Sequence, residues 1–345
     1  MRVTLKNSPR RFEVRADQTL LDAALGAGLN LPHSCKGGNC GACKARLISG
    51  QIAYAHGAPL GLSDSEAAEG LILLCQAQAR GDVTLETFEM RPAADAGIKQ
   101  LPCRIERAVA VSHDVMQLFL KLPAAEEFAF VPGQYLDIML PGGRRRSFSI
   151  ASPPHDATPL ELHVRRVVGG EFTDKLFHAE TRDALLRIEG PLGQFVYRES
   201  AAPMLLVGGG TGLAPLLSMM RHVIENHIGR DMHLYWGVRS ERDLYALQTL
   251  QGLQGQAPRL HFTPVLSEAG ADWRGRSGWV HEAPAQDFAD LSGFEVYMAG
   301  PPAMISAARR AFAAQGAAPD KIYFDSFDYA PDALERQRSS ASSKS

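Results

Sequence analysis

The alternation of hydrophobic and polar positions predicts a small unit of strands and one helix at the start of the chain. Residues 2–7 and 10–17 alternate as the two strands of a hairpin do, and residues 19–29 carry apolar side chains at helical spacing. A closing strand is predicted over residues 81–88. One helix between strands predicts an α+β unit over residues 1–91.

The next stretch, residues 101–199, follows a Pro-, Gly- and Ala-rich linker predicted over residues 92–100. Its apolar runs are short and are separated by Gly and Pro turns. Strands are predicted over residues 103–111, 115–123, 134–140, 145–152, 160–167 and 184–191. Such a series is typical of a small antiparallel β-barrel.

The pattern changes at residue 200, where buried apolar runs begin to alternate with amphipathic helices. Strands are predicted over residues 204–210, 233–238, 260–266, 295–300 and 321–327. Helices are predicted over residues 215–227, 242–253 and 302–316. The alternation predicts an α/β domain over residues 200–330, with a parallel sheet and helices on both faces. The polar residues 331–345 are predicted to form a disordered tail.

Composition and charge exclude several classes of protein. The chain has 345 residues, of which 45% are hydrophobic and 21% charged, so globular domains are expected. A net charge of −2 gives the whole molecule no reason to bind nucleic acid or an anionic membrane. No apolar run is long enough to span a bilayer, and the first residues lack the apolar core of a signal peptide. We therefore expect a cytoplasmic monomer without a nucleic-acid or membrane partner.

The sequence SCKGGNCGAC, residues 34–43, concentrates three of the five cysteines in a glycine-rich stretch. Cys35, Cys40 and Cys43 have the spacing C-x4-C-x2-C, and Cys75 lies far along the chain, as in plant-type [2Fe–2S] ferredoxins. Zinc sites more often pair two C-x2-C knuckles, and the sequence has no second knuckle. The glycines allow the backbone to direct N–H groups at thiolate sulfurs. An iron–sulfur cluster is the favoured interpretation, with a zinc site or structural thiols as the alternatives.

Two motifs in the strand-rich stretch suit a pyrophosphate. RSFS, residues 146–149, begins with an arginine that can form charge-assisted hydrogen bonds to phosphate. GGEFT, residues 169–173, opens a predicted helix whose first N–H groups and Thr173 hydroxyl form an anion-binding start. Each motif alone is weak, because an exposed arginine is usually solvated and Gly-Gly is usually a turn. Their occurrence in one barrel that precedes an α/β domain makes them specific.

Two further motifs lie at strand-to-helix turns of the α/β domain. GGGTGLAP, residues 208–215, follows a buried strand, and its glycines permit close approach of the backbone to phosphates. It lacks the full G-x-G-x-x-G fingerprint, so the dinucleotide inference from this motif alone is partial. MAGPPAM, residues 298–304, is a second such turn. Ligands bind at the carboxyl ends of parallel strands, so both turns predict a nucleotide site.

With these motifs in this order, the chain to about residue 330 resembles the NAD(P)H-dependent ferredoxin reductases that have an N-terminal plant-type ferredoxin domain. The segments RRRSFSIASPPHD and LELHVRRVVGGEFTDKLF are similar to reductases of the CDP-6-deoxy-Δ-3,4-glucoseen type. YWGVRSERDLY is similar to reductases of naphthalene-type dioxygenases. The resemblance implies a β-grasp ferredoxin domain, a flavin-binding antiparallel barrel and a nucleotide-binding α/β domain. It implies a [2Fe–2S] cluster on Cys35, Cys40, Cys43 and Cys75.

The resemblance also assigns residues to the two nucleotide cofactors. For FAD it implies residues of the barrel motifs: Arg146, Phe148, Ser149, Gly170 and Thr173. For NADH or NADPH it implies residues of the two glycine-rich turns: Gly210, Thr211, Gly212 and Pro301. Ser149 and Phe327, expected near the isoalloxazine, are the predicted catalytic residues. The family usually has Tyr at the position of Phe148 and Cys at that of Ala299.

The implied activity is electron transfer from NAD(P)H through FAD and the cluster to an external acceptor protein such as an oxygenase. A flavin is needed because a nicotinamide gives two electrons together and a cluster takes one at a time. The alternative is a reductase for a deoxysugar dehydratase, and a redox sensor with little turnover is a rival from another class. RSERD, residues 239–243, carries charges of both signs where an adenosine ribose would lie. We expect NADH to be preferred and NADPH to be accepted.

Overall fold

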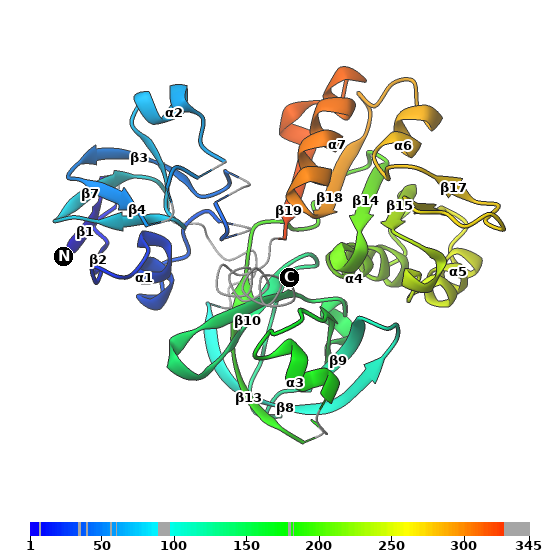
Figure 1. Cartoon of the computed structure of the whole chain (residues 1–345), viewed down its shortest axis with the longest axis horizontal. Helices are drawn as coiled ribbons and strands as arrows, with labels where there is room; N and C mark the ends of the chain where they lie inside the picture. The colour runs from blue at the N-terminus through cyan, green and yellow to red at the C-terminus, as the bar shows by residue number, and fades with distance from the viewer. Residues whose placement is uncertain are drawn as a thin grey trace, which may run out of the picture. The chain divides into compact units, whose positions relative to one another are not determined.

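The computed structural model describes residues 1–6, 8–33, 36–38, 41–55, 57–59, 61–88, 97–178, 181 and 183–327 (Figure 1). The chain divides into two units, Met1–Ile98 with Leu192–Gln194 and Lys99–Pro191 with Phe195–Ser345. The predicted barrel and the predicted α/β domain thus lie in one unit. The boundaries predicted for the three domains stay predictions, and the predicted tail lies outside the described residues.

The first unit is built on a five-stranded sheet in the order β2-β1-β7-β3-β5. Its strands are β1 (Arg2–Leu5), β2 (Arg11–Glu13), β3 (Lys44–Ser49), β5 (Leu71–Leu73) and β7 (Val83–Glu86). β1 pairs antiparallel with β2 and parallel with β7, which confirms the predicted hairpin. Helix α1 (Leu20–Gly26) buries its apolar face and is capped by Thr19, whose side chain accepts a hydrogen bond from the Asp22 N–H. The α+β class is confirmed.

Five elements of the first unit were not predicted. They are β3 and β5 of the main sheet, β4 (Ile52–Tyr54), its antiparallel partner β6 (Ala77–Ala79) and helix α2 (Asp64–Ala68). Each has three to six residues, too few for a hydrophobic period to show clearly. α2 begins with a capping box in which Ser63 and Glu66 bond each other's backbone N–H groups.

The second unit begins with six antiparallel strands in the order β11-β10-β13-β8-β9-β12. They are β8 (Lys99–Ala110), β9 (Val115–Lys121), β10 (Tyr135–Met139), β11 (Arg145–Ser149), β12 (Leu160–Arg165) and β13 (Leu185–Leu192). An isolated bridge between Ile150 and Leu162 joins the two ends of this order, so the sheet closes on itself. Alternate residues such as Leu118, Ile138 and Leu162 fill the interior. The predicted barrel is confirmed, and helix α3 (Thr173–His178) follows β12.

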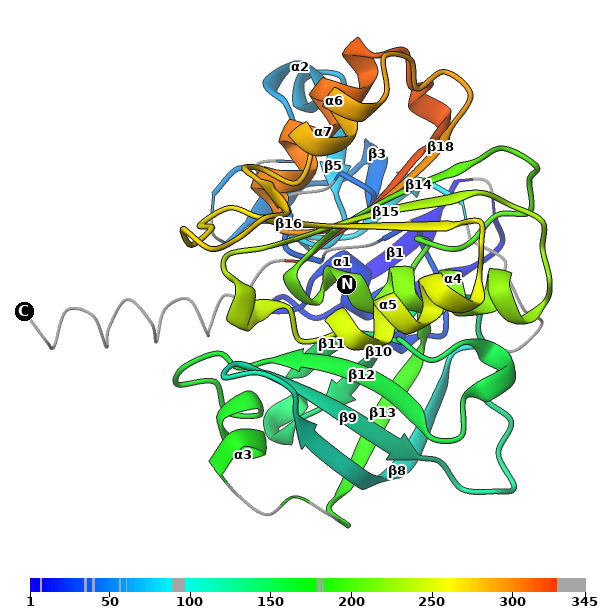
Figure 2. The ribbon, with the colours of Figure 1, turned by 90° about the vertical axis from the view of Figure 1, so that its right-hand side faces the viewer.

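The rest of the second unit is a parallel sheet in the order β17-β16-β15-β14-β18-β19. Its strands are β14 (Met204–Gly209), β15 (Met232–Val238), β16 (Leu260–Leu266), β17 (Arg276–Ser277), β18 (Glu295–Gly300) and β19 (Ile322–Ser326). Its helices are α4 (Leu213–Glu225), α5 (Leu247–Gln256), α6 (Glu282–Asp287) and α7 (Pro302–Ala314). α4 and α5 cover one face of the sheet and α6 and α7 the other, which confirms the predicted α/β class (Figure 2).

One difference from the predicted elements occurs where local hydrogen bonds compete with a helix. α5 begins at Leu247 and not at residue 242, because Glu241–Asp243 form a 3-10 turn (η4). In that turn the Asp243 carboxylate accepts hydrogen bonds from the backbone and side chain of Ser240. The two-residue strand β17 and the six-residue helix α6 were not predicted from the pattern.

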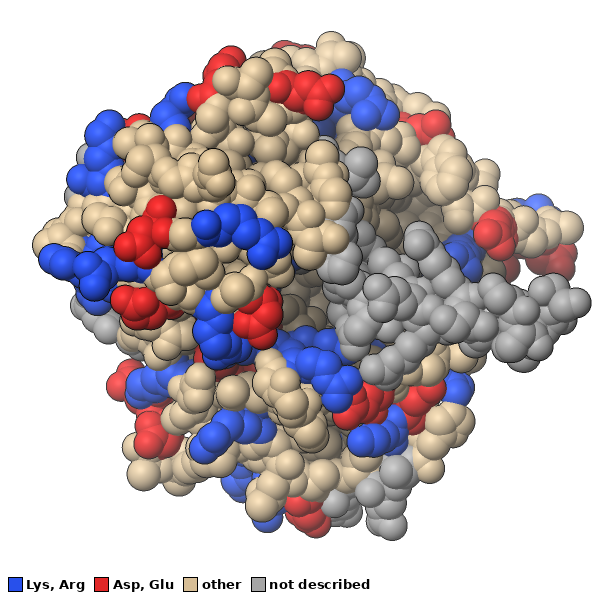
Figure 3. Space-filling view, turned by 60° about the vertical axis from the view of Figure 1, so that its left-hand side comes forward, with Lys and Arg blue, Asp and Glu red and all other residues tan. Residues whose placement is uncertain are grey.

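The helices of the described residues are short, and the charges on the face drawn in Figure 3 are mixed. None of the helices in the described residues is both long enough and apolar enough to cross a bilayer. On the face drawn in Figure 3, lysine and arginine side chains are interspersed with aspartate and glutamate. No broad patch of a single charge stands out among the described residues of that face, in keeping with the net charge of −2.

Candidate functional site

Two of the four predicted cluster ligands lie in the described part of the first unit. Cys43 precedes β3 and Cys75 follows β5, and the residues are 3% and 4% exposed. The Leu74 N–H donates to the Cys43 carbonyl oxygen at 3.1 Å, which holds the two segments side by side. Cys35 and Cys40 lie outside the described residues.

The pKa of the Tyr54 phenol is affected by both Cys43 and Cys75. The phenol oxygen accepts a hydrogen bond from the Leu73 N–H at 3.2 Å. Burial raises the pKa of Tyr54, the Leu73 hydrogen bond opposes that rise, and the charges of Cys43 and Cys75 add to it. Buried thiols brought together from distant segments are a soft donor set of the kind that holds iron–sulfur clusters. The described residues therefore fit a [2Fe–2S] cluster.

The backbone beside these cysteines is shaped by neighbouring loops. Gly38 has a φ of 81°, which favours glycine, and its carbonyl oxygen accepts a hydrogen bond from the Gly61 N–H at 2.7 Å. Lys44, next to Cys43, pairs with Glu66 at 2.5 Å. The hydrogen bond from Lys44 is the largest cause that lowers the pKa of Glu66, to about 2. Gly38 and Lys44, the described neighbours of the cysteines, are thus both held by contacts to other segments.

Three consecutive arginines lead into the predicted flavin strand β11, and each has different contacts. Arg144 pairs with Glu171 at 2.5 Å. Arg145 donates to both oxygens of the buried Glu189, at 2.5 and 3.1 Å. Arg146, the predicted pyrophosphate ligand, donates through Nη1 to the Arg145 carbonyl oxygen at 2.9 Å. The first two arginines have carboxylate partners and were not predicted to bind FAD.

Two buried hydroxyl groups in this unit, on Ser149 and Ser326, have no hydrogen-bond partner in the described structure. Their residues are 8% and 2% exposed. Leaving a buried hydroxyl unsatisfied costs about 1–3 kcal/mol, so such groups are expected where a ligand supplies the partner. Ser149 was predicted for this role and Ser326 was not, although it lies in the motif FDSF. These hydroxyls fit a polar cofactor.

The rest of the predicted flavin set lies around the loop before α3. Phe148 packs against Phe172, with ring centroids 5.7 Å apart. The Thr173 hydroxyl accepts a hydrogen bond from the Val167 N–H at 3.0 Å and donates to the Val167 carbonyl oxygen at 3.2 Å. A Cβ on Gly170 would lie 2.5 Å from the Thr173 hydroxyl oxygen. Gly170 and Thr173 therefore form one tight loop, in which the threonine hydroxyl bonds backbone.

The predicted nicotinamide-nucleotide residues gather where β14 and β18 end. Gly210, Thr211 and Gly212 form a 3-10 turn (η3) between β14 and α4. A Cβ on Gly212 would lie 2.0 Å from the Ala299 carbonyl oxygen, so only glycine fits. Pro301 is the N-cap residue of α7, directly after β18. The Phe327 N–H donates to the Gly300 carbonyl oxygen at 3.0 Å. The structure brings both turns to one edge of the sheet.

Arg165, at the end of β12, is a residue that sequence reasoning missed. Gly210 has a φ of 56°, and a Cβ there would lie 2.9 Å from Arg165 Nη1. The guanidinium thus lies against the phosphate-type loop, with Nε 3.1 Å from an Asp114 carboxylate oxygen. The barrel places a positive charge beside the glycine loop. Only the tertiary fold brings these distant segments together, so the sequence offered no signal beyond the arginine itself.

A buried polar network joins the barrel to the parallel-sheet half of the second unit. His163 bonds Tyr245 Oη through Nδ1 at 2.9 Å and Glu161 Oε1 through Nε2 at 2.8 Å. Arg221 on α4 donates to Glu161 Oε2 at 2.6 Å. Burial opposes ionisation of Glu161, but the His163 hydrogen bond and the charges of His163 and Arg221 lower its pKa to about 2. This network holds the two predicted cofactor platforms together.

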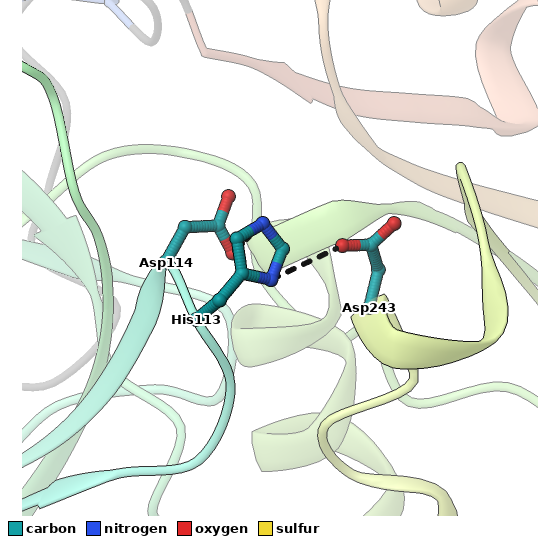
Figure 4. Close-up of side chains that lie close together, drawn as sticks. All are labelled: His113, Asp114 and Asp243. Atoms are coloured by element: carbon teal, nitrogen blue, oxygen red, sulfur yellow. Dashed lines mark ion pairs between the residues drawn. The ribbon is translucent and has the colours of Figure 1, made fainter.

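A second polar cluster crosses the same junction and comprises His113, Asp114 and Asp243 (Figure 4). His113 Nδ1 lies 3.7 Å from Asp243 Oδ1, and His113 Nε2 lies 4.0 Å from Asp114 Oδ1. Burial raises the pKa of Asp243, but hydrogen bonds from Ser240 and nearby positive charge give a net lowering. Asp114 also pairs with Arg165, so the cluster's charges already have partners.

Comparisons with known proteins match three domain families along the chain. Residues 3–80 match the 2Fe-2S iron-sulfur cluster binding domain family. Residues 102–197 match the oxidoreductase FAD-binding domain family, and residues 206–310 match the oxidoreductase NAD-binding domain family. The matched regions contain the cysteine site, the flavin strand and the glycine loop, respectively.

Relatives with the same organisation cover almost the whole chain. The CDP-6-deoxy-L-threo-D-glycero-4-hexulose-3-dehydrase reductase of Yersinia pseudotuberculosis is 37% identical, over 95% of this chain and 98% of the relative. The aromatic O-demethylase reductase subunit of an Amycolatopsis strain is 36% identical, over 92% of this chain and 96% of the relative. The crystal structure of the Amycolatopsis cytochrome P450 reductase GcoB superposes with a TM-score of 0.78 at 36% identity, covering 95% of this chain and 99% of that one. The chain therefore belongs to the family of iron–sulfur flavoprotein reductases, oxidoreductases that carry electrons from NAD(P)H through FAD and a [2Fe–2S] cluster to an external acceptor.

Proposed function

We propose that the external acceptor is the oxygenase component of a multicomponent oxygenase, and that NADH is the preferred electron donor. The observation that carries the proposal is that one chain combines a nucleotide loop, a flavin barrel and a cysteine site. Relatives that span nearly the whole chain include the reductase subunit of an aromatic O-demethylase and the electron transfer component of a xylene/toluene monooxygenase. A chain that ends its own electron path at a one-electron centre needs a partner that accepts single electrons.

The barrel residues bind and orient the flavin in this proposal. FAD, when bound, takes two electrons from the nicotinamide and releases them singly to the cluster. Arg146 holds the pyrophosphate by charge-assisted hydrogen bonds. Ser149 supplies its buried hydroxyl to the isoalloxazine, and Phe148 packs beside the ring. Gly170 and Thr173 keep the neighbouring loop close, because the threonine bonds the loop backbone.

The strand ends of the α/β half bind the nicotinamide nucleotide. Gly210, Thr211 and Gly212 offer backbone N–H groups to the phosphates, and Arg165 adds a positive charge beside them. Pro301 borders the same edge, where α7 begins. Phe327 packs against the hydrophobic core beside β18 and shields the reacting rings from water. The buried network around Glu161 fixes the orientation of the barrel relative to the sheet. The alignment of the nicotinamide with the flavin for hydride transfer would depend on that orientation.

The four cysteines hold the cluster in the proposal, and the structure describes two of them. Cys43 and Cys75 are the described ligands, and Cys35 and Cys40 are proposed from their spacing.

A specific observation supports a second acceptor. The Yersinia relative, 37% identical, is named as the reductase of a CDP-6-deoxy-hexulose 3-dehydrase. A deoxysugar dehydratase is therefore the alternative partner, and either acceptor would take single electrons from the cluster.

Reconstitution distinguishes the acceptors. The purified protein, with FAD and cluster loaded, is mixed with NADH and either an aromatic oxygenase component or the sugar dehydrase. NADH oxidation coupled to hydroxylated or demethylated product supports the oxygenase, and coupling to deoxysugar formation supports the alternative. Rapid reduction of cytochrome c by NADH in the absence of either partner excludes a redox sensor. Failure of both couplings with fast cytochrome c reduction contradicts both proposed acceptors while leaving the reductase activity established.

A further inference from the structure

Gln76 directly follows the predicted ligand Cys75, and its side-chain amide faces the cysteine loop. Nε2 donates to the Lys36 carbonyl oxygen at 2.9 Å and to the Cys75 carbonyl oxygen at 3.0 Å. The same nitrogen lies 4.0 Å from Cys75 Sγ. Lys36 is the residue after Cys35, so one amide connects the three-cysteine loop to the segment that carries the fourth cysteine.

The stem of the glutamine is packed as closely as its amide is bonded. A Cβ on Gly38 would lie 2.8 Å from Gln76 Cγ, so the loop backbone rests directly on this side chain. Pro59 lies on the other side of Gly38, with its Cβ 3.1 Å from the same position. The Gly61 N–H holds the Gly38 carbonyl oxygen. Gln76 therefore packs against the backbone of the loop at Gly38 and also joins Lys36 to Cys75 by hydrogen bonds.

We propose that Gln76 is a positioning residue for the cluster that also tunes its potential. The amide sets the spacing between the loop cysteines and Cys75, because it bonds the carbonyl oxygens of Lys36 and Cys75 simultaneously. Its N–H groups place the positive end of a dipole beside Cys75 Sγ, which stabilises the more negative, reduced cluster. The proposal rests on the cluster assignment made above and does not depend on which protein accepts the electron.

The test replaces the donor while keeping the stem. Gln76→Met preserves an unbranched side chain against Gly38 and removes both N–H donors. Gln76→Glu preserves the shape and places carboxylate oxygens against two carbonyl oxygens. Gln78→Met is the matched control, because Gln78 in β6 donates to the Asp17 carbonyl oxygen at 3.5 Å, away from the cysteines.

Three readouts are measured on the loaded full-length protein: iron and sulfide content, the rate of iron release to a chelator, and the midpoint potential of the cluster by EPR-monitored titration. We expect Gln76→Met to release iron several-fold faster and to lower the equilibrium constant for cluster reduction about tenfold, which is about 59 mV for one electron. Gln76→Glu is expected to lower it further. Gln78→Met should match the wild type in all three readouts, and NADH should reduce the flavin equally in every variant.

The outcomes separate the proposal from the assignment beneath it. Wild-type protein without iron and sulfide overturns the cluster assignment itself. A wild-type cluster together with unchanged potential and iron release in Gln76→Met overturns the role of Gln76 alone. Faster iron release with unchanged potentials in both Gln76 variants shows a purely structural glutamine and also contradicts the tuning. If Gln76→Met does not assemble a cluster, the test of tuning passes to Gln76→Glu. A lowered midpoint potential in Gln76→Glu supports the tuning, and an unchanged one contradicts it.

Discussion

The cysteine site of the first unit and the glycine loop of the second are built from opposite parts of the residue. Cys43 and Cys75 would contribute side-chain sulfurs to the proposed cluster, and the Leu74 N–H bonds the Cys43 carbonyl oxygen. Gly210 and Gly212 contribute backbone only, and a Cβ on Gly212 would lie 2.0 Å from a carbonyl oxygen. A side-chain site is lost when an atom is removed, whereas a backbone site is lost when an atom is added. The two sites therefore respond to mutation in opposite ways.

The largest effect is expected from removing a sulfur. Cys75→Ala should abolish cluster assembly and reduce NADH-driven cytochrome c reduction to background, while NADH still reduces the flavin in the second unit. Iron analysis, EPR and stopped-flow absorbance measure the three outcomes. Cys103→Ala is the control: this cysteine is equally buried, in β8, and burial raises the pKa of its thiol to about 12, so it stays protonated and inert. Cytochrome c reduction that survives in Cys75→Ala would remove this residue from the ligand set.

A comparison of two carboxylates, one from each unit, predicts a pH effect. Glu66 and Glu161 both have a pKa of about 2, but Glu161 is largely buried at the junction of barrel and sheet. Because its folded pKa lies below the ordinary value of 4.5, its stabilisation is complete above about pH 5 and is lost as the pH falls towards 2. The contribution is on the order of 3 kcal/mol.

Glu161→Gln should therefore lower the free energy of unfolding of the second unit at pH 7 and change it much less at pH 3. Urea unfolding followed by the fluorescence of the second unit, which contains all three tryptophans, measures this. Glu66→Gln, in the first unit, should have little effect at either pH, because a partly exposed ion pair contributes little. An equal loss at both pH values would show that Glu161 acts by shape and not by charge.

Arg146→Ala tests a side-chain contact to a cofactor in the second unit, whose glycine loop is proposed to bind through its backbone. A charged hydrogen-bond partner of a phosphate contributes roughly 1.5–3 kcal/mol, so FAD affinity should fall about tenfold to hundredfold. Flavin content after gel filtration and fluorescence titration of apoprotein measure the change. Arg144→Ala, two residues away, removes the ion pair with Glu171 and should leave FAD affinity within about twofold. Tight FAD retention in Arg146→Ala means that the pyrophosphate lies elsewhere.

The smallest expected effect comes from adding one methyl group. Gly212→Ala places a Cβ against the Ala299 carbonyl oxygen, so the loop must shift away from its phosphate-binding shape. KM for NADH should rise about tenfold, about 1.4 kcal/mol, with a smaller change in kcat. Gly252→Ala in α5 is the control, because a Cβ there meets nothing within 4 Å, and alanine in a helix is neutral or stabilising. An unchanged KM would show that the loop accommodates the added methyl group without losing its affinity for NADH, and would contradict the role proposed for Gly212.

The parts of this molecule that could be predicted from the sequence are those where a hydrophobic pattern repeats over many residues or where a motif lies within a few neighbouring residues. The barrel strands and the β–α alternation repeat over many residues, and the cysteine spacing is confined to one loop. Arg165 and Ser326 were missed for a different reason. Each becomes notable only through a contact or a lack of contact that the tertiary structure creates. Asp243 shows the same limit: the sequence places it in RSERD, the charged segment expected beside an adenosine ribose, and the structure buries it against Ser240 and His113.

The capping of Ser240 by Asp243 has a consequence for how this reductase can change its electron donor. The proposed phosphate site, made of backbone N–H groups and Arg165, would bind the phosphates shared by both dinucleotides and would not distinguish NADH from NADPH. Because Asp243 is turned inward, we expect discrimination between NADH and NADPH to depend on the exposed side chains of Arg239, Glu241 and Arg242. Affinity and selectivity thus reside in separate pieces of the chain. We therefore expect that reversing the charge at Glu241 shifts the preference between NADH and NADPH and leaves the buried contacts of the second unit unchanged.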